Sequence, residues 1–262
     1  MTDKSIEPTW PGIVDRVRDR TPARVLVDRA GAGYRSATQL ELRAAHAAAR
    51  DAVRTELNIE NDLGPEFIRH WQLFEVQTNA GSKDEYLLRP DLGRRFNEAS
   101  ELKITSNCPK AVDLQIVIGD GLSVTALAAQ VPPLLPLIAQ AAVRRNWELG
   151  RPFVVRHCRV GIMNQVGELL QPQIVVLLIG ERPGLATAES LSAYMAFRPG
   201  PNDSDARRNL VSNIHARGVP VGSAALRIVN LAAQMRTQEL SGTALKENLE
   251  APKWLKRNEE TG

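Results

Sequence analysis

The stretch IVVLLIG, residues 174–180, constrains the fold more than any other part of the chain. Its six consecutive apolar side chains leave no polar face, and a strand of that kind belongs in a parallel sheet covered on both sides. Segments VDLQIVIG and FVVRHC, at 112–119 and 153–158, have a similar character, and helical sequence separates the three. Strands alternating with helices predict an α/β fold built on a doubly wound parallel sheet.

Helices dominate the predicted structure before that sheet. Residues 36–57 are rich in Ala, Leu, Arg and Glu and contain no Gly or Pro, so they predict a long helix that Ser36 or Thr38 can cap. Pro65 suits the first turn of a second helix. The pattern also predicts a strand over 74–78 that pairs with residues 85–90, and a helix capped by Asp91.

The change of pattern divides the chain into a mainly helical N-terminal region, residues 1–107, and a sheet domain, residues 108–262. The second part also contains two predicted helices, one that starts at the prolines Pro132 and Pro133 and a closing helix at 221–240. Shorter apolar runs at 191–197 and 210–214 are weaker candidates for strands.

Composition narrows the classes of protein that the chain can be. Its 43% hydrophobic and 24% charged residues are ordinary for a soluble globular protein. No apolar run approaches the roughly 20 residues of a membrane span, and the first residues lack the layout of a secretory signal. The net charge of +3 comes from scattered Lys and Arg, which argues against nucleic-acid binding, and two cysteines fit a reducing compartment. We therefore expect a cytoplasmic protein with no membrane and no nucleic acid as partner.

Three loops follow the predicted parallel strands: GDGLS at 119–123, RVGI at 159–162 and GERPG at 180–184. In open sheets ligands bind beyond the carboxyl ends of the strands, so these loops form the candidate binding site. GDGLS suits a cofactor loop as well as it suits a plain turn in which Asp120 caps the next helix. Glu181 follows a buried strand directly, where it either faces a ligand or pairs with Arg182.

The sequence contains no recognisable set of catalytic or metal-binding residues. It has no G-x-G-x-x-G after a strand and no G-x-x-x-x-G-K-[ST], the usual nucleotide motifs. None of the four histidines has a second ligand at zinc spacing, and no G-x-S-x-G marks a nucleophile. We therefore assign no catalytic residue and no metal ligand to this chain.

Several blocks of sequence resemble one known family. From about Arg24 to Leu245 the chain is similar to the small (light) subunit of ethanolamine ammonia-lyase, an adenosylcobalamin-dependent enzyme. Several long blocks in the same order make the resemblance specific. The blocks are RAG (29–31), HAAARDAV (46–53), YLLRPDLGRR (86–95), DLQIVIGDGLS (113–123), VGELL (166–170), VVLLIGERPGL (175–185), ESLSAY (189–194) and SNIH (212–215).

The resemblance implies a division of labour between two subunits. In this family a large barrel subunit holds ethanolamine, while the small subunit has a helical N-terminal region and a Rossmann-like domain that closes over cobalamin at the interface. The holoenzyme converts ethanolamine to acetaldehyde and ammonia by a radical mechanism, in an assembly similar to a dodecamer of six large and six small subunits. The resemblance thus implies adenosylcobalamin as cofactor, a large-subunit partner, and a cytoplasmic place, either free or inside a bacterial microcompartment.

The family's cofactor contacts match three positions of this sequence. Val160 follows the second strand and offers apolar surface, and Glu181 can accept hydrogen bonds from corrin amides. Leu210 stands where the family usually has a cysteine, and leucine cannot replace a contact made by sulfur. The pattern D-x-H-x-x-G, by which other cobalamin proteins supply a histidine to cobalt, is absent. By resemblance, the cofactor therefore keeps its own dimethylbenzimidazole.

Two rival hypotheses stay open. A self-sufficient hydrolase or dehydrogenase would need a nucleophile system or a nicotinamide fingerprint, and neither is visible in the sequence. A non-catalytic scaffold subunit that never contacts the cofactor would need neither, and the missing cysteine at Leu210 keeps that alternative alive.

Overall fold

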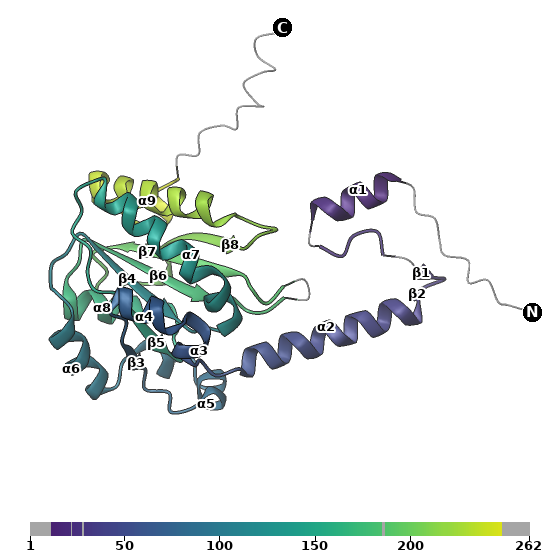
Figure 1. Cartoon of the computed structure of the whole chain (residues 1–262), viewed down its shortest axis with the longest axis horizontal. Coiled ribbons are helices and arrows are strands. Elements are labelled where there is room, and N and C mark those ends of the chain that lie inside the picture. The colour runs from purple at the N-terminus through teal and green to yellow at the C-terminus, as the bar shows by residue number, and fades with distance from the viewer. Residues whose placement is uncertain (1–11, 22, 28, 185–186, 248–262) are drawn as a thin grey trace, which may run out of the picture.

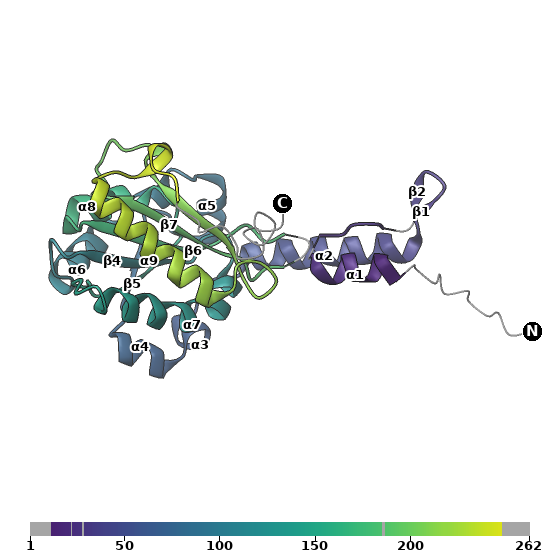
Figure 2. The same ribbon diagram turned by 90° about the horizontal axis from the view of Figure 1, so that it is seen from above.

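A computed structural model describes residues 12–21, 23–27, 29–184 and 187–247 of the chain. It consists of a body built around one large sheet and an arm that projects from one side of that body (Figures 1 and 2). The predicted α/β class, a helical N-terminal part followed by a mostly parallel sheet with helices, is confirmed.

The arm begins and ends with helices. α2 confirms the predicted long helix, although none of its described side chains is buried. The predicted caps were wrong, because Arg35 holds the N-cap position and makes no side-chain hydrogen bond there. The helix forms from the high helix propensity of its own Ala, Leu and Arg residues. The arm comprises α1 (Gly12–Arg20), β1 (Arg29–Ala30), β2 (Gly33–Tyr34) and α2 (Ser36–Arg54).

The sheet of the body has six strands in the order β3-β5-β4-β6-β7-β8. The first four run parallel to one another. β7 pairs antiparallel with β6, and β8 pairs antiparallel with β7. The loop 181–190 between β6 and β7 is too short for the crossover that a parallel pair needs. The strands are β3 (Glu75–Gln77), β4 (Leu114–Gly119), β5 (Phe153–Arg156), β6 (Ile174–Gly180), β7 (Leu191–Phe197) and β8 (Asn209–Ile214).

Helices cover both faces of the sheet, which explains its apolar strands. Ile116 and Val176 pack in one core layer with the helices α7 and α9, while Val117 and Leu177 pack in the other layer with α8. Successive side chains of a strand point to opposite faces, so both faces need apolar residues. The covering helices are α7 (Val124–Val143), α9 (Val221–Gln238), α3 (Ile59–Leu63) and α4 (Pro65–Trp71) on one side, and α6 (Glu98–Asn107) and α8 (Ile162–Leu170) on the other.

The predicted hairpin at residues 74–90 was wrong in its second half. β3 forms, but it pairs in parallel with β5, with Val76 opposite Val155. Residues Lys83–Leu88 form helix α5, which begins where the Ser82 side chain accepts a hydrogen bond from the Glu85 backbone N–H. A local cap and a distant strand partner together outweigh the alternating pattern.

Asp91 does not cap a long helix as predicted. Residues Leu92–Arg94 form a short 3-10 turn, and α6 starts only after Asn97, whose side chain accepts a hydrogen bond from Ser100. Asp91 instead forms a 2.7 Å ion pair with Arg89.

The helix α7 starts well before the prolines that were predicted to begin it. Its cap is Ser123, whose Oγ accepts a hydrogen bond from the Ala126 backbone N–H, and three prolines lie inside the helix. Interior prolines cost about 3 kcal/mol each in helix propensity, so burial against the sheet must stabilise this helix. By length and composition α7 could cross a membrane, contrary to expectation, but half of that stretch is buried in the body, as in a core helix.

The division of the chain at residue 107 stays a prediction. β3 lies before that point and forms an edge of the sheet. Phe74 and Phe96 also lie before it, and their rings stand 5.5 and 6.3 Å from the ring of Phe153. The N-terminal region therefore supplies one strand and part of the core of the body.

Candidate functional site

The rim of the sheet holds a pocket of about 360 Å³ beyond the carboxyl ends of β4, β5 and β6. All three loops predicted from the sequence contribute to it, and Val160, Glu181 and Leu210 all line it. The three predicted residues are thus brought together at one cavity, while the binding of a ligand there stays a prediction. We call this cavity the rim pocket; it is lined by Gly121–Leu122, Cys158–Val160 and Ile179–Arg182, with Tyr86, Ser192, Tyr194, Leu210 and Ser212.

The turn after β4 lies against the end of β6, and this contact joins two of the loops. Gly121 has a φ of +57°, and a Cβ at this position would stand 2.3 Å from the carbonyl oxygen of Gly180. The Leu122 backbone N–H donates a hydrogen bond to the same oxygen over 3.1 Å. Only glycine satisfies both the backbone angle and the close approach.

Glu181 is half-buried and connects the ends of three strands. Its Oε2 accepts a hydrogen bond from the Ser190 hydroxyl at 2.7 Å. Its Oε1 accepts from the Ser192 hydroxyl at 2.6 Å and from the Asn213 backbone N–H at 2.8 Å. Within the described part of the chain it forms no ion pair with Arg182. A carboxylate has about four acceptor positions, so one position on Oε2 is left for a ligand.

A buried ion pair lies behind the floor of the rim pocket. Lys83 Nζ stands 3.6 Å from Asp120 Oδ2, and the two side chains are 5% and 0% exposed. Asp120 Oδ1 accepts a hydrogen bond from the Cys158 backbone N–H at 2.9 Å. Asp120 therefore ties the turn after β4 to the turn after β5 and does not cap α7. The GDGLS segment combines a pocket-lining loop with a serine cap.

Tyr86 and Arg159 form one wall of the rim pocket. The Arg159 guanidinium carbon lies 4.1 Å from the centre of the Tyr86 ring, and its Nη2 donates to the Tyr86 carbonyl oxygen. The Tyr86 hydroxyl donates to the Cys158 carbonyl oxygen at 3.0 Å, and burial raises the pKa of this phenol. Sequence reasoning missed Tyr86 because the pattern placed it on a strand instead of on α5.

Tyr194 is a second residue that sequence reasoning missed. Burial and the nearby Glu181 carboxylate raise the pKa of its phenol, so the hydroxyl stays a neutral donor at the rim pocket. Ser192 and Tyr194 alternate along β7, and Leu210 and Ser212 alternate along β8. This period of two in otherwise apolar strands is the signal that could have identified the pocket-facing side chains.

Leu210 and Val160 give the rim pocket its apolar surface. Leu210 lies opposite Tyr194 in the β7–β8 pair, near the start of the edge strand β8, and is 42% exposed. Val160 is partly buried and packs on the α8 side of the core. Both side chains therefore have surface that a ligand in the rim pocket can contact.

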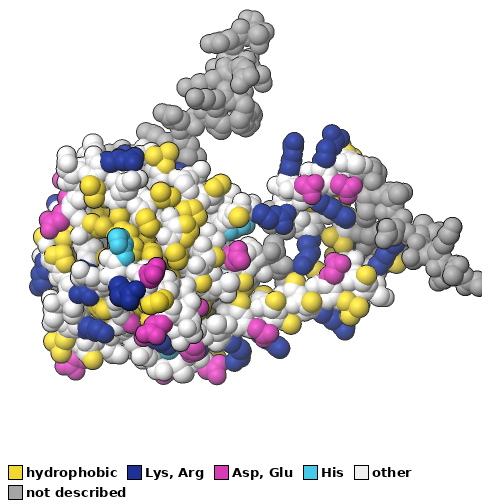
Figure 3. Space-filling view, viewed as in Figure 1, with side chains coloured by type: hydrophobic (Ala, Val, Ile, Leu, Met, Phe, Trp, Pro, Cys, Tyr) yellow, Lys and Arg dark blue, Asp and Glu magenta, His cyan; other side chains and the backbone are white. Residues whose placement is uncertain are grey.

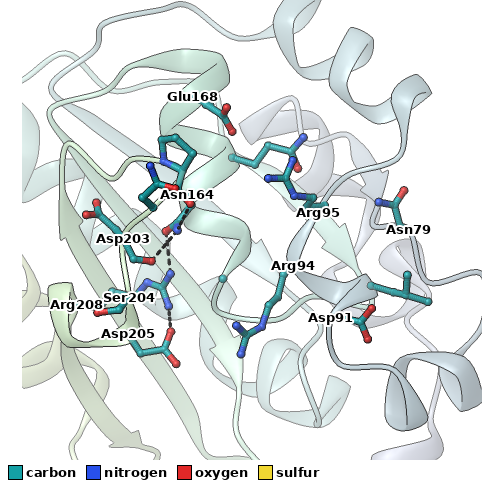
Figure 4. Close-up of a pocket in the computed structure, with 15 residues that line it drawn as sticks. Asn79, Asp91, Arg94, Arg95, Asn164, Glu168, Asp203, Ser204, Asp205 and Arg208 are labelled. Atoms are coloured by element: carbon teal, nitrogen blue, oxygen red, sulfur yellow. Dashed lines mark hydrogen bonds and ion pairs between the residues drawn. The ribbon is translucent and has the colours of Figure 1, made fainter.

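A second cavity of about 650 Å³ lies beside α8, and we call it the polar pocket (Figure 4). One of its three guanidinium groups is paired: Arg208 pairs with Asp205 and donates to Asn164 Oδ1 at 2.8 Å. Burial lowers the pKa of Arg208. The pocket thus mixes both signs of charge, and its charged lining consists of Asp91, Arg94, Arg95, Glu168, Asp203, Asp205 and Arg208.

The described residues include no group of three His, Cys, Asp or Glu side chains suited to a metal ion. His157, the histidine next to the rim pocket, has structural partners instead. Its Nδ1 lies 2.9 Å from the Ala80 carbonyl oxygen and its Nε2 lies 3.2 Å from Glu56 Oε2. The chain thus offers its ligands hydrogen-bonding groups and apolar surface.

Comparison with known proteins agrees with this geometry. The family model described as "Ethanolamine ammonia-lyase light chain (EutC)" matches residues 12–246. The ethanolamine ammonia-lyase small subunit of Listeria innocua is 42% identical over 88% of this chain and 77% of its own length. Those of Clostridium perfringens and Clostridium acetobutylicum are 42% and 39% identical, over 88% and 86% of this chain and 76% and 91% of their own lengths. The chain belongs to the ethanolamine ammonia-lyase light chain family.

Proposed function

We propose that this chain is the small subunit of an adenosylcobalamin-dependent ethanolamine ammonia-lyase and that its rim pocket receives one side of the coenzyme. The observation that carries the proposal is the convergence of Val160, Glu181 and Leu210 on one cavity from three separate elements. Membership of the family supports the activity of the whole complex, a carbon–nitrogen lyase that acts on ethanolamine.

The rim pocket suits part of a corrinoid. Its volume of about 360 Å³ lies near the lower end of ligand sites, roughly 300–1,000 Å³, and cobalamin is larger than such a cavity. Val160 and Leu210 offer apolar surface to a macrocycle. Tyr194 can donate to, and Glu181 can accept from, the amide side chains around the corrin ring. A second polypeptide has to complete the site, and we propose that the large subunit does so.

The coenzyme, when bound, supplies the radical chemistry, and this chain binds and orients it. No histidine occurs among the described residues that line the rim pocket. Burial raises the pKa of the Cys158 thiol well above its ordinary value, so this sulfur stays protonated. The residues of the pocket would therefore hold the coenzyme by hydrogen bonds and apolar contact, and Glu181 and Tyr194 would fix its orientation.

We further propose assembly with large subunits into a dodecamer of six large and six small subunits, in the cytoplasm and either free or inside a microcompartment. The projecting arm supports a partner, since Ile13, Leu26 and Leu40 on it are 61%, 51% and 64% exposed. Large apolar side chains exposed together are typical of surfaces that a partner covers.

Co-expression with the large subunit from the same genome tests the proposal. We expect a co-purified complex that binds adenosylcobalamin and releases ammonia from ethanolamine, and no turnover by this chain alone. A complex without corrinoid affinity would support the scaffold alternative, and turnover by the isolated chain would support a self-sufficient enzyme.

A pair of matched variants tests the position of the site. Leu210→Asp places a carboxylate in the rim pocket beside Glu181, and we expect at least about tenfold weaker cobalamin binding, since an unpaired buried charge costs several kcal/mol. Leu226→Asp makes the same change on α9, where the side chain is 61% exposed and outside the pocket. Equal affinities of the two variants would contradict the assignment of this pocket.

A further inference from the structure

A third cavity, of about 410 Å³, lies where the arm meets the body, and its ionisable side chains are three arginines and one histidine. His46 and Arg50 reach it from α2, and Arg159 and Arg182 reach it from the loops after β5 and β6. We call it the cationic pocket. Among the described residues no carboxylate lines it, and Ala49, Val53, Leu87, Leu122 and Pro183 complete its lining.

Two carboxylates of α2 and α5, those of Asp51 and Asp84, compensate little of this positive charge. Asp84 forms a 2.8 Å ion pair with Arg54, outside the pocket lining. Asp51 stands 4.0 Å from Arg50, with both side chains about three-quarters exposed, and such a surface pair neutralises little. The described residues offer Arg182 no ion pair. The excess of positive charge in this cavity is therefore uncompensated within the described part of the chain.

Arg159 is held in place for a ligand. Its guanidinium lies over the Tyr86 ring and donates through Nη2 to the Tyr86 carbonyl oxygen. Its Nε is buried and has no hydrogen-bond partner among the described residues. A buried donor without a partner costs about 1–3 kcal/mol. A ligand in the cavity can instead accept from Nη1, for which the described residues provide no hydrogen-bond partner.

The cationic pocket adjoins the rim pocket, because Leu122, Arg159 and Arg182 line both cavities. A ligand in the rim pocket can therefore extend a substituent into the cationic pocket. The polar pocket is less suited to an anion, since four carboxylates line it together with its arginines: those of Asp91, Glu168, Asp203 and Asp205.

We propose that the cationic pocket binds a phosphate group, the phosphodiester in the nucleotide loop of the coenzyme, while the corrin occupies the rim pocket. The inference rests on the proposed function and adds a role for the arm. Phosphate oxygens match the forked donors of arginine. α2 then forms one wall of the coenzyme site through His46 and Arg50. Figure 3 shows basic side chains on the arm, with acidic and hydrophobic ones among them.

The test compares three corrinoids that differ in the proposed contact. Cobalamin carries the phosphodiester, cobinamide phosphate carries a phosphate without the base, and cobinamide carries neither. Each is titrated into the complex of large and small subunits, and its dissociation constant is measured by absorbance. The small subunit is the parent, the double variant His46→Gln/Arg50→Gln, or the control Arg43→Gln. His46 and Arg50 line the cationic pocket and not the rim pocket, and Arg43 is an exposed charge of α2 outside both linings.

We expect the double variant to bind cobalamin and cobinamide phosphate about tenfold or more weakly. Its affinity for cobinamide, and the affinities of Arg43→Gln for all three ligands, should stay within about twofold of the parent. An equal loss of affinity for cobinamide, or no loss of affinity for the two phosphate-bearing ligands, would overturn this inference and leave the proposed function standing. If the parent complex binds no corrinoid, the proposed function fails together with the inference.

Inorganic phosphate, titrated calorimetrically into the same complexes without corrinoid, separates the two sources of a phosphate group. Weak binding by the parent that weakens further in the double variant is expected, together with competition against cobinamide phosphate. Binding of inorganic phosphate combined with unchanged cobalamin affinity in the double variant would assign the pocket to a free anion and overturn the coenzyme assignment.

Discussion

The backbone N–H of Asn213 donates a hydrogen bond to Oε1 of Glu181 over 2.8 Å, although the two residues lie 32 positions apart in the chain. Asn213 has a φ of +60°, a left-handed angle that asparagine tolerates better than most residues. The contact links the end of β8 to the loop after β6. Glu181 therefore shapes the rim pocket as well as facing it.

Replacing Glu181 with Gln should weaken cobalamin binding with limited effect on turnover at saturating coenzyme. Gln keeps the size of the side chain but accepts fewer hydrogen bonds, and one to a charged acceptor contributes about 1.5–3 kcal/mol. The measurement is a coenzyme titration of the reconstituted complex. Ser190→Ala is the control, because it removes a Glu181 partner that does not line the pocket. An equal loss of affinity in both variants would show that Glu181 acts through the loop alone.

Lys83→Met should strongly destabilise the chain. The change leaves the Asp120 carboxylate, which is 0% exposed, without its cation. Breaking a buried pair in this way costs about 3–5 kcal/mol of the free energy of unfolding, measured by urea denaturation. Adding Asp120→Asn should recover part of the loss, since Asn can still accept from Cys158. Lys103→Met, an exposed change, should cost less than about 1 kcal/mol, and a similar loss in Lys83→Met would contradict the prediction.

Gly121→Ala should destabilise the chain and distort the rim pocket. The new Cβ would stand 2.3 Å from the Gly180 carbonyl oxygen at a φ of +57°, and we expect a loss of at least about 2 kcal/mol. Gly222→Ala on α9 is the matched control, because nothing lies within 4 Å of its Cβ. Alanine there should leave stability unchanged or raise it by up to about 1 kcal/mol. Similar melting temperatures for the two variants would be evidence against this packing.

Stability should fall as pH rises from about 9 towards 11. Burial raises the pKa of the Cys108 thiol from 9.0 to about 11. Below pH 9 the thiol is protonated in both states, whereas above it the unfolded chain loses the proton first and is favoured. The two-unit shift corresponds to about 2–3 kcal/mol at most. The free energy of unfolding, measured by urea denaturation, should fall less between pH 8 and pH 10.5 in Cys108→Ala than in the parent. Equal decreases would rule out this thiol as a cause.

Much of the body follows from sequence alone. The unbroken apolar residues of IVVLLIG require cover on both faces, which predicts a doubly wound sheet before any contact is known. Ligands of such sheets bind beyond the strand ends, which led to the loops that contain Val160 and Glu181, and both loops line the rim pocket. Both predictions depend only on residues that are neighbours in the sequence: an apolar run and the loop that follows it.

Tertiary structure decided the rest. The pairing of Val76 with Val155 drew β3 into the sheet, and burial kept α7 helical through its prolines. Tyr86, Tyr194 and Arg159 meet at one cavity only because α5, β7 and the loop after β5 converge there. Spacing along the chain cannot encode such contacts, since they depend on how separate elements pack. The sequence by itself determined the α/β class and most of the strands, because unbroken apolar runs need cover on both faces of a sheet. Packing decided how the strands pair and which side chains line the rim pocket.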